Sequence, residues 1–163
     1  MNNSPAAVAL KMIQYFGHDV RRINHALKVY GFTKHIATLE KLSSEQLTLL
    51  EIAALLHDIG IKEAEKQYQS TAGTYQELLG PDIARELLAD LNLSETETER
   101  VCYLIGHHHS YHKIDALDFQ ILVEADFLVN IFEDQMQPAQ IENIQSKYFK
   151  TATAINLLIG MYR

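Results

Sequence analysis

Apolar residues recur every three or four positions along most of this chain, which is the spacing of helices that bury one face. After Ser4 and Pro5, an apolar stripe from Val8 to Phe16 predicts a first helix that ends at Gly17. The same spacing predicts helices over 19–39 with a bend or break at Gly31, from Ser43 to His57 and Asp58, from Gly80 to just before Asn92, from Ser94 to the histidines at 107–109, over 117–132, and from Pro138 to about 160. No stretch alternates for long with the two-residue period of a strand, so we expect an all-α fold.

Helix-start signals support several of these boundaries. Ser43-x-x-Gln46 and Ser94-x-x-Glu97 both have the capping-box pattern, in which two side chains satisfy backbone groups at the start of a helix. Gly80-Pro81 is typical of another start, because proline fits the first helical turn. The polar stretch over 61–74 is expected to be a loop.

Length and composition suit one domain. The chain has 163 residues, of which 47% are hydrophobic, and this is enough for one substantial core. We expect a compact helical bundle over 1–163, with its core over about 18–133 and a C-terminal helix over about 138–160.

Charge and hydropathy argue against two classes of partner. The formal net charge is −7, so the chain lacks the broad basic surface that duplex nucleic acid requires. No segment reaches the roughly 20 apolar residues of a membrane span, and we expect a cytoplasmic protein without a membrane partner. The single cysteine, Cys102, excludes an internal disulfide. A homodimer is also open, although a buried terminal helix explains equally well the apolar residues Ile155, Leu157, Leu158, Ile159 and Met161.

The stretch Leu56-His57-Asp58-Ile59-Gly60 carries the strongest chemical signal. It ends an apolar run that indicates a buried helix, and an unpaired carboxylate in such a place costs several kcal/mol. A divalent metal would offset this cost, because imidazole and carboxylate are both good ligands. The alternative is a histidine and an aspartate at a helix end, each hydrogen-bonded to nearby backbone. The five residues alone leave both interpretations open.

Two further polar residues stand in apolar helical stretches, His25 near the start and Asp126 near the end of the predicted bundle. In the order His25, His57-Asp58, Asp126, the sequence resembles the HD superfamily of metal-dependent phosphohydrolases over almost its whole length. The resemblance implies that these four residues are metal ligands on three packed helices. A mixed nitrogen and oxygen set with open positions favours Mn, Fe, Co, Ni or Mg over a closed structural zinc site.

A second histidine cluster follows Gly106 at 107–109, with His112 close behind. Dinuclear branches of the superfamily have a histidine pair in this part of the chain, so the resemblance implies that His107 and His108, or His108 and His109 in a register shifted by one, contact a second ion. A solvated histidine-rich loop is the alternative. Those branches also have a histidine where Tyr75 to Gly80 stands here, and Glu77 is the residue that could replace it. The Gly-Tyr-Pro motif of cyclic di-GMP diesterases is absent.

A metal site of this kind serves phosphoester hydrolysis, because the ion lowers the pKa of bound water and neutralises phosphoryl charge. Asp58 would ligate the metal and orient the attacking water. Lys62 and Lys66 could contact the phosphate, with Lys62 also assisting catalysis, although an ordinary solvated charge pattern explains both lysines as well. We therefore expect hydrolysis of a small phosphorylated substrate such as a nucleotide. The alternative functions are a non-catalytic module that senses metal or nucleotide, and a helical scaffold with structural histidines.

Overall fold

The computed structural model describes residues 4–163, and no strand occurs among them. The fold is all-α, as the hydrophobic spacing predicts. Its helices, with one 3-10 turn (η1), are α1 (Pro5–Phe16), α2 (Val20–Leu39), α3 (Ser44–Leu56), α4 (Ile61–Tyr68), α5 (Gly73–Leu88), α6 (Glu95–His107), η1 (Tyr111–Lys113), α7 (Leu117–Glu133), α8 (Pro138–Tyr148) and α9 (Ala152–Tyr162).

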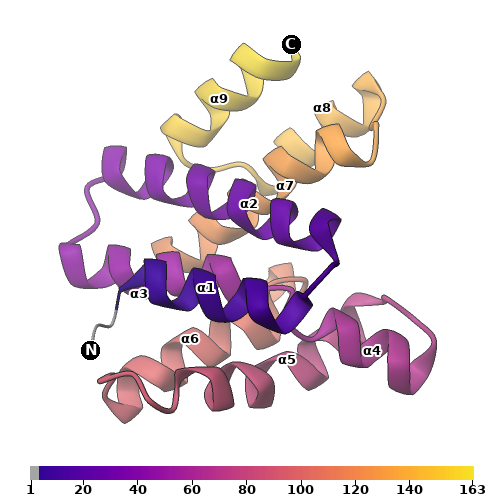
Figure 1. Ribbon diagram of the computed structural model, residues 1–163. Coiled ribbons are helices and arrows are strands. Elements are labelled where there is room, and N and C mark those ends of the chain that lie inside the picture. The colour runs from indigo at the N-terminus through magenta and orange to yellow at the C-terminus, as the bar shows by residue number, and fades with distance from the viewer. Residues whose placement is uncertain (1–3) are drawn as a thin grey trace.

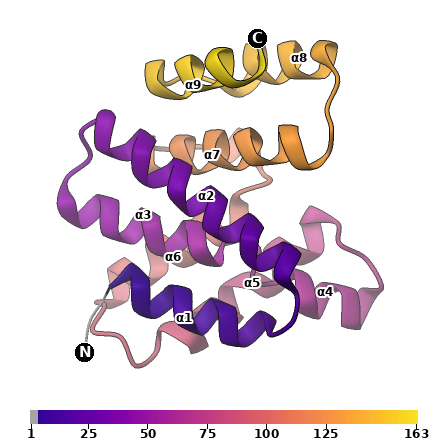
Figure 2. The same ribbon diagram turned by 45° about the horizontal axis from the view of Figure 1, so that its top comes forward.

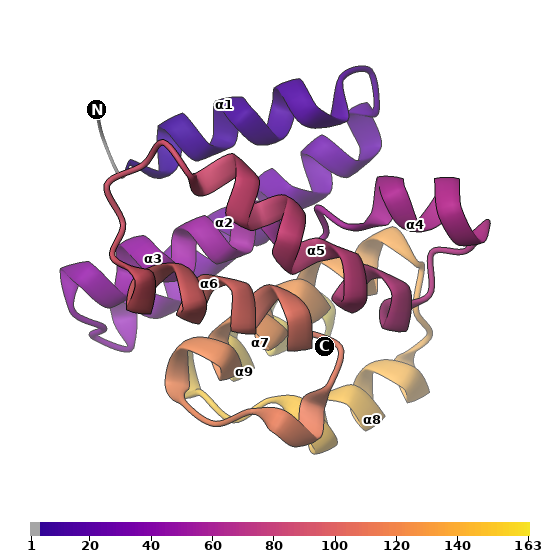
Figure 3. The same cartoon turned by 90° about the horizontal axis from the view of Figure 1, so that it is seen from below.

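Three helices, α2, α3 and α7, pack against one another at the centre of the molecule (Figure 1). α1 lies against α2 and α3, whereas α8 and α9 lie together beyond α7 (Figure 2). Seen from below, α5 and α6 run side by side, and α4 lies next to α5 (Figure 3). The buried apolar side chains of these layers form one hydrophobic cluster.

The C-terminal half of α3 lies in the middle of this cluster. Every residue from Leu50 to Leu56 is buried, and His57 directly after them is completely inaccessible. Both predicted capping boxes are present, at Ser43 with Gln46 and at Ser94 with Glu97. The helix start at Ser43 therefore sets the register that delivers His57 and Asp58 to the centre of the fold.

Four local expectations are wrong, and each has a tertiary reason. α2 runs without a break past Gly31, which lies on its exposed face. The expected loop over 61–74 contains α4, whose single buried side chain, Ala64, anchors it. Pro81 lies inside α5, not at its start, and its ring packs where Gly106 of α6 leaves room.

The fourth difference is at the C-terminus, where α8 and α9 replace one continuous helix. The buried Glu124 carboxylate of α7 accepts hydrogen bonds from the backbone N–H groups of Lys150 and Thr151 and from the Thr151 hydroxyl. Those amides are therefore not free for a continuing helix, and Thr151 instead caps α9.

Candidate metal centre

Donor atoms from α2, α7 and the end of α3 meet at one point. The Nε2 atoms of His25 and His57 are 3.2 Å apart. Asp126 Oδ1 lies 3.2 Å from His25 Nε2 and 3.5 Å from His57 Nε2. Asp58 Oδ2 lies 3.3 and 3.4 Å from the same two nitrogens. The structure thus brings together all four residues expected from the sequence to be ligands.

These separations are those of ligands that share one ion. Ligand atoms about 2.1 Å from a metal lie about 3.0 Å apart in an octahedral site and about 3.4 Å apart in a tetrahedral one. His25, His57 and Asp58 form one group that could hold a metal ion, and His57, His108 and Asp126 form another.

The histidine tautomers add an independent argument. His25 Nδ1 is 2.5 Å from a Glu133 carboxylate oxygen, and His57 Nδ1 is 2.6 Å from the Ala54 carbonyl oxygen. Each Nδ1–H therefore donates outward, and a neutral ring presents the lone pair of Nε2 to the centre. Lone pairs facing carboxylates repel unless a cation, either a proton or a metal ion, lies between them. The donor set therefore fits a metal.

Without a metal, protons must lie between the histidine nitrogens and the carboxylates. The directions of the pKa shifts agree with this. Burial opposes protonation of His57, but attraction to Asp58 and hydrogen bonds to Asp126 and Asp58 outweigh it and raise its pKa well above the ordinary value. Burial likewise opposes ionisation of Asp58, but the His57 charge and a hydrogen bond from His108 bring its pKa well below the usual range. The cluster thus holds its own positive charge when no ion is bound.

This arrangement predicts that metal binding displaces protons. A protonated His57 cannot be a ligand, so we expect the apparent affinity for Mn²⁺ to rise about tenfold per pH unit and to level off only above the raised pKa of His57. Calorimetric titrations in buffers of different ionisation enthalpy between about pH 6 and pH 8 measure the protons released. An affinity that is flat over this window, with no proton release, would contradict the assignment of His57 as a ligand.

The second histidine pair is His108 with His109, the shifted register of the two expected. His108 Nε2 is 3.3 Å from Asp58 Oδ1, and Asp58, His108 and His109 form a further group that could hold an ion. His107 is not part of it, which corrects the first register. Its Nδ1 is 2.7 Å from the Tyr103 carbonyl oxygen, and its ring lies against the Tyr103 ring. The reason is that successive residues at the end of α6 point about 100° apart.

His108 repeats the geometry of His57. Its Nδ1 is 2.8 Å from the Ile105 carbonyl oxygen, so a neutral ring presents the lone pair of Nε2 to Asp58 Oδ1. The two oxygens of Asp58 therefore face different histidines, Oδ2 toward His25 and His57 and Oδ1 toward His108.

Gln76, not Glu77, faces this second group. The Gln76 amide donates to the Thr71 carbonyl oxygen (2.6 Å), so its Oε1 accepts from His109 Nε2 at 3.2 Å. Glu77 instead accepts a hydrogen bond from the Ser110 hydroxyl and belongs to none of the groups that could hold a metal among residues 4–163. The expectation that Glu77 replaces a histidine ligand is therefore not supported, because the helical register of α5 turns it aside.

The expected phosphate-binding lysines also point elsewhere. Lys62 donates to the Tyr15 carbonyl oxygen at 2.9 Å and lies over the Tyr15 ring, on the α1 side of the molecule. The Lys66 side chain is 77% exposed and is 4.0 Å from Glu63. Neither lysine lines the cavity of about 440 Å³ that opens onto three of the four expected metal ligands. This arrangement does not support a catalytic or substrate-binding role for Lys62 or for Lys66.

Sequence reasoning missed the cations that do line this cavity, Arg21 and Arg22. They precede His25 by four and three residues, so they lie one helical turn before it on α2. This spacing is the sequence signal from which the two arginines could have been predicted to lie near the metal site. Arg22 is held by Asp19 and Glu65, whereas Arg21 is exposed and forms no ion pair within residues 4–163.

Glu133 is a second residue that the motif did not reveal, and it orients His25. Its carboxylate contacts both His25 Nδ1 and the Lys28 ammonium group, the latter at 2.9 Å. We expect Glu133→Ala to weaken metal binding about 10- to 100-fold, because a metal-binding histidine loses its fixed ring orientation and part of its basicity. Equilibrium dialysis with Mn²⁺ measures the change, and Glu142→Ala on the exposed face of α8 is the matched control. Equal affinities of the two variants would contradict this role.

No helix between residues 4 and 163 is both long and apolar enough to cross a membrane. The HD domain family model matches residues 22–145, which contain all four expected ligands. Among solved structures, the fold is similar to that of a predicted HD superfamily hydrolase from an uncultured Thermotogales bacterium, with 25% sequence identity and a TM-score of 0.69 over 95% of this chain and 83% of that one. No curated protein sequence matches the chain. Because the family model covers more than half of its length, this chain belongs to the HD domain family.

Proposed function

We propose that this protein is a metal-dependent phosphohydrolase that cleaves a small phosphorylated substrate. The observation that carries the proposal is the convergence of histidine Nε2 atoms and carboxylate oxygens on one point, each histidine held by an outward hydrogen bond from Nδ1. The similarity to a structure described as a predicted HD superfamily hydrolase supports the hydrolytic part of the proposal.

A bound divalent ion would supply Lewis acidity, lowering the pKa of water and offsetting charge on the phosphoryl oxygens. His25, His57, Asp58 and Asp126 would hold it. In the reaction, a water oxygen forms a bond to phosphorus, the ester P–O bond breaks, and the leaving oxygen gains a proton. Asp58 is placed to orient the water, since its Oδ1 faces the second histidine pair while its Oδ2 faces the first site.

The environment of His109 sets its protonation state. Burial, together with the neighbouring His108, lowers the pKa of His109 to about 4, so its ring is neutral at pH 7. Because His109 Nε2–H donates to Gln76, its Nδ1 is unprotonated and can accept from water or bind an ion. We propose that His108, His109 and Asp58 would together hold a second ion or the attacked phosphoryl group.

Arg21 takes the role first expected of the lysines. It lines the cavity beside His25, it is exposed, and it forms no ion pair with any residue between 4 and 163. A guanidinium group binds phosphoryl oxygens through two parallel hydrogen bonds, so Arg21 is suited to holding the substrate phosphate.

The test is metal analysis of the purified protein combined with a substrate panel. The protein, loaded in turn with Mn, Fe, Co, Ni or Mg, is incubated with 4-nitrophenyl phosphate, nucleoside monophosphates and triphosphates, cyclic nucleotides and guanosine tetraphosphate. We expect a metal content of about one ion or more per chain and turnover of at least one phosphoester. Metal binding without any turnover would overturn the proposal in favour of a metal or nucleotide sensor.

A further inference from the structure

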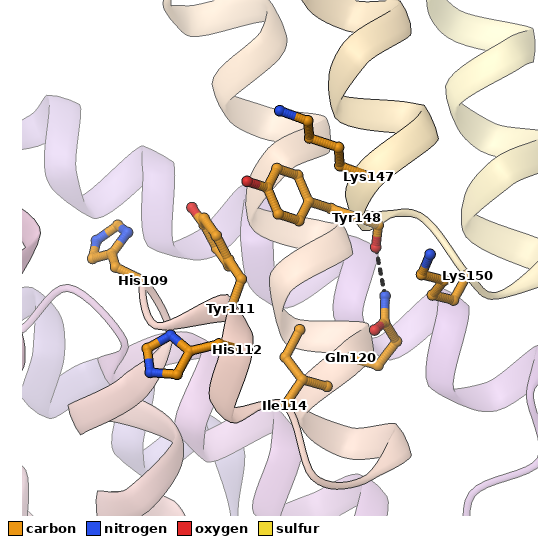
Figure 4. Close-up of a pocket in the computed structure, with 8 residues that line it drawn as sticks. All are labelled: His109, Tyr111, His112, Ile114, Gln120, Lys147, Tyr148 and Lys150. Atoms are coloured by element: carbon orange, nitrogen blue, oxygen red, sulfur yellow. Dashed lines mark hydrogen bonds between the residues drawn. The ribbon is translucent and has the colours of Figure 1, made fainter.

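A second cavity of about 640 Å³ adjoins the metal centre. His109 lines both this cavity and the one that contains the metal ligands. The other side chains come from η1 and Ile114 after it, from Gln120 of α7, and from the end of α8 with the residues after it. We define the Tyr-Lys pocket by six of them, Tyr111, His112, Ile114, Lys147, Tyr148 and Lys150. In Figure 4, Tyr111 and Tyr148 lie between His109 on one side and Lys150 on the other.

The charge of this pocket is opposite to that of the whole chain. The formal net charge of the protein is −7, yet no acidic side chain lines the pocket and two lysines do. Both lysines are exposed, and neither ammonium group forms an ion pair among residues 4–163. The metal cavity, by contrast, is lined by several carboxylates, those of Asp58, Glu65, Asp126, Glu133 and Asp134. Of these two cavities, the Tyr-Lys pocket is therefore the one whose lining carries a net positive charge and favours an anion.

Aromatic rings form one wall of the pocket, and their positions are fixed. The Tyr111 and Tyr148 ring centroids are 4.6 Å apart, and Tyr148 stacks on Phe127 of α7 at 5.1 Å. Gln120 donates to the Tyr148 carbonyl oxygen at 2.7 Å, an interaction drawn in Figure 4. Rigid aromatic rings beside a cation are well suited to a flat ring that carries negative charge, because stacking and charge attraction then act together.

We infer that the Tyr-Lys pocket binds the leaving part of the substrate, and that this part is an aromatic ring bearing an anionic group of its own. This inference rests on the proposed function. The phosphoryl group that is cleaved lies at the metal centre. The ring contacts Tyr111 and Tyr148, and the second anion contacts Lys147 and Lys150. His109, shared by both cavities, marks where the two parts of the substrate join.

The first test measures binding to the metal-free protein by calorimetry. Because Arg21 lines the metal cavity and can also attract phosphate, the part of the binding that is lost in the pocket variants reports the Tyr-Lys pocket. We expect AMP to bind about tenfold more tightly than ribose 5-phosphate, which lacks the ring. Lys147→Gln combined with Lys150→Gln should weaken AMP binding about tenfold. Lys113→Gln, which removes a nearby exposed charge outside the pocket, is the control and should bind AMP as wild type does.

The second test uses the metal-loaded enzyme with 4-nitrophenyl phosphate, AMP and adenosine 3′,5′-bisphosphate. We expect the bisphosphate to have the lowest KM, and the double lysine variant to raise that KM about tenfold while kcat and the constants for 4-nitrophenyl phosphate stay unchanged. Hydrolysis that is equally efficient in wild type and double variant for all three would overturn the pocket inference and leave the phosphohydrolase standing. Lysine-dependent AMP binding without hydrolysis of any phosphoester would support the pocket and overturn the enzyme.

Discussion

Asp58→Ala should abolish both metal binding and hydrolysis while the protein stays folded. Asp58 contacts His25 and His57 through one carboxylate oxygen and His108 through the other, so its removal takes a ligand from both groups that it connects. We expect metal content to fall to near zero and turnover to drop by at least about 1,000-fold. Elemental analysis and phosphate-release assays measure the two losses.

The fold should survive because the surrounding helix is held by apolar packing. Leu55 and Leu56, on the same stretch of α3, are buried in the main hydrophobic cluster and make no use of the carboxylate. Circular dichroism of the metal-free proteins checks this expectation. Asp82→Ala, which removes an exposed carboxylate from α5, is the control and should keep metal content and turnover.

Two outcomes would change the assignment. If Asp58→Ala fails to fold, the isosteric Asp58→Asn carries the test, because it keeps the side-chain volume and removes the charge. Full metal binding and turnover in a folded variant would show that Asp58 is neither ligand nor catalytic residue. If wild type binds metal but hydrolyses nothing, and Asp58→Ala differs from it only in metal content, the protein is a sensor and not an enzyme.

Gly60→Ala should destabilise the fold strongly although the change is one methyl group. A Cβ at this position would lie 2.6 Å from the Gln76 carbonyl oxygen and 2.8 Å from the Gly80 backbone nitrogen. These are backbone atoms of α5, so the whole helix must move away to make room. We expect a loss of about 2–3 kcal/mol in the free energy of unfolding, measured by urea denaturation of the metal-free protein.

Gly31→Ala is the matched control, because a Cβ at Gly31 meets no atom within 4 Å and the residue lies inside α2. There alanine should stabilise the protein by up to about 1 kcal/mol, since glycine is the weaker helix former. Equal stabilities of the two variants would show that the close approach of α5 to Gly60 is not needed. The same approach sets the place of Gln76 against His109, so Gly60→Ala should also weaken binding at the second histidine pair.

Local chemistry alone was enough to predict the helices that begin with their own caps. Ser43 with Gln46 and Ser94 with Glu97 satisfy backbone groups within four residues, so these starts do not depend on the rest of the fold. The candidate ligands needed more than local chemistry. A histidine or carboxylate in an apolar helix is costly unless it has a partner, which makes His25, Asp58 and Asp126 conspicuous, but their combination as one metal site came from the resemblance to the HD superfamily.

The tertiary structure decided what depends on rotation about a helix axis and on contacts distant in sequence. Successive residues of a helix point about 100° apart, so His107 lies against Tyr103, whereas His108 and His109 lie at the candidate site. The cations that line the metal cavity are Arg21 and Arg22 and not Lys62, because α1 packs where Lys62 points and supplies the Tyr15 carbonyl oxygen. The break between α8 and α9 likewise follows from Glu124, whose carboxylate lies 26 and 27 residues before the amides it binds. No local pattern encodes such partners, since each exists only once the helices have packed.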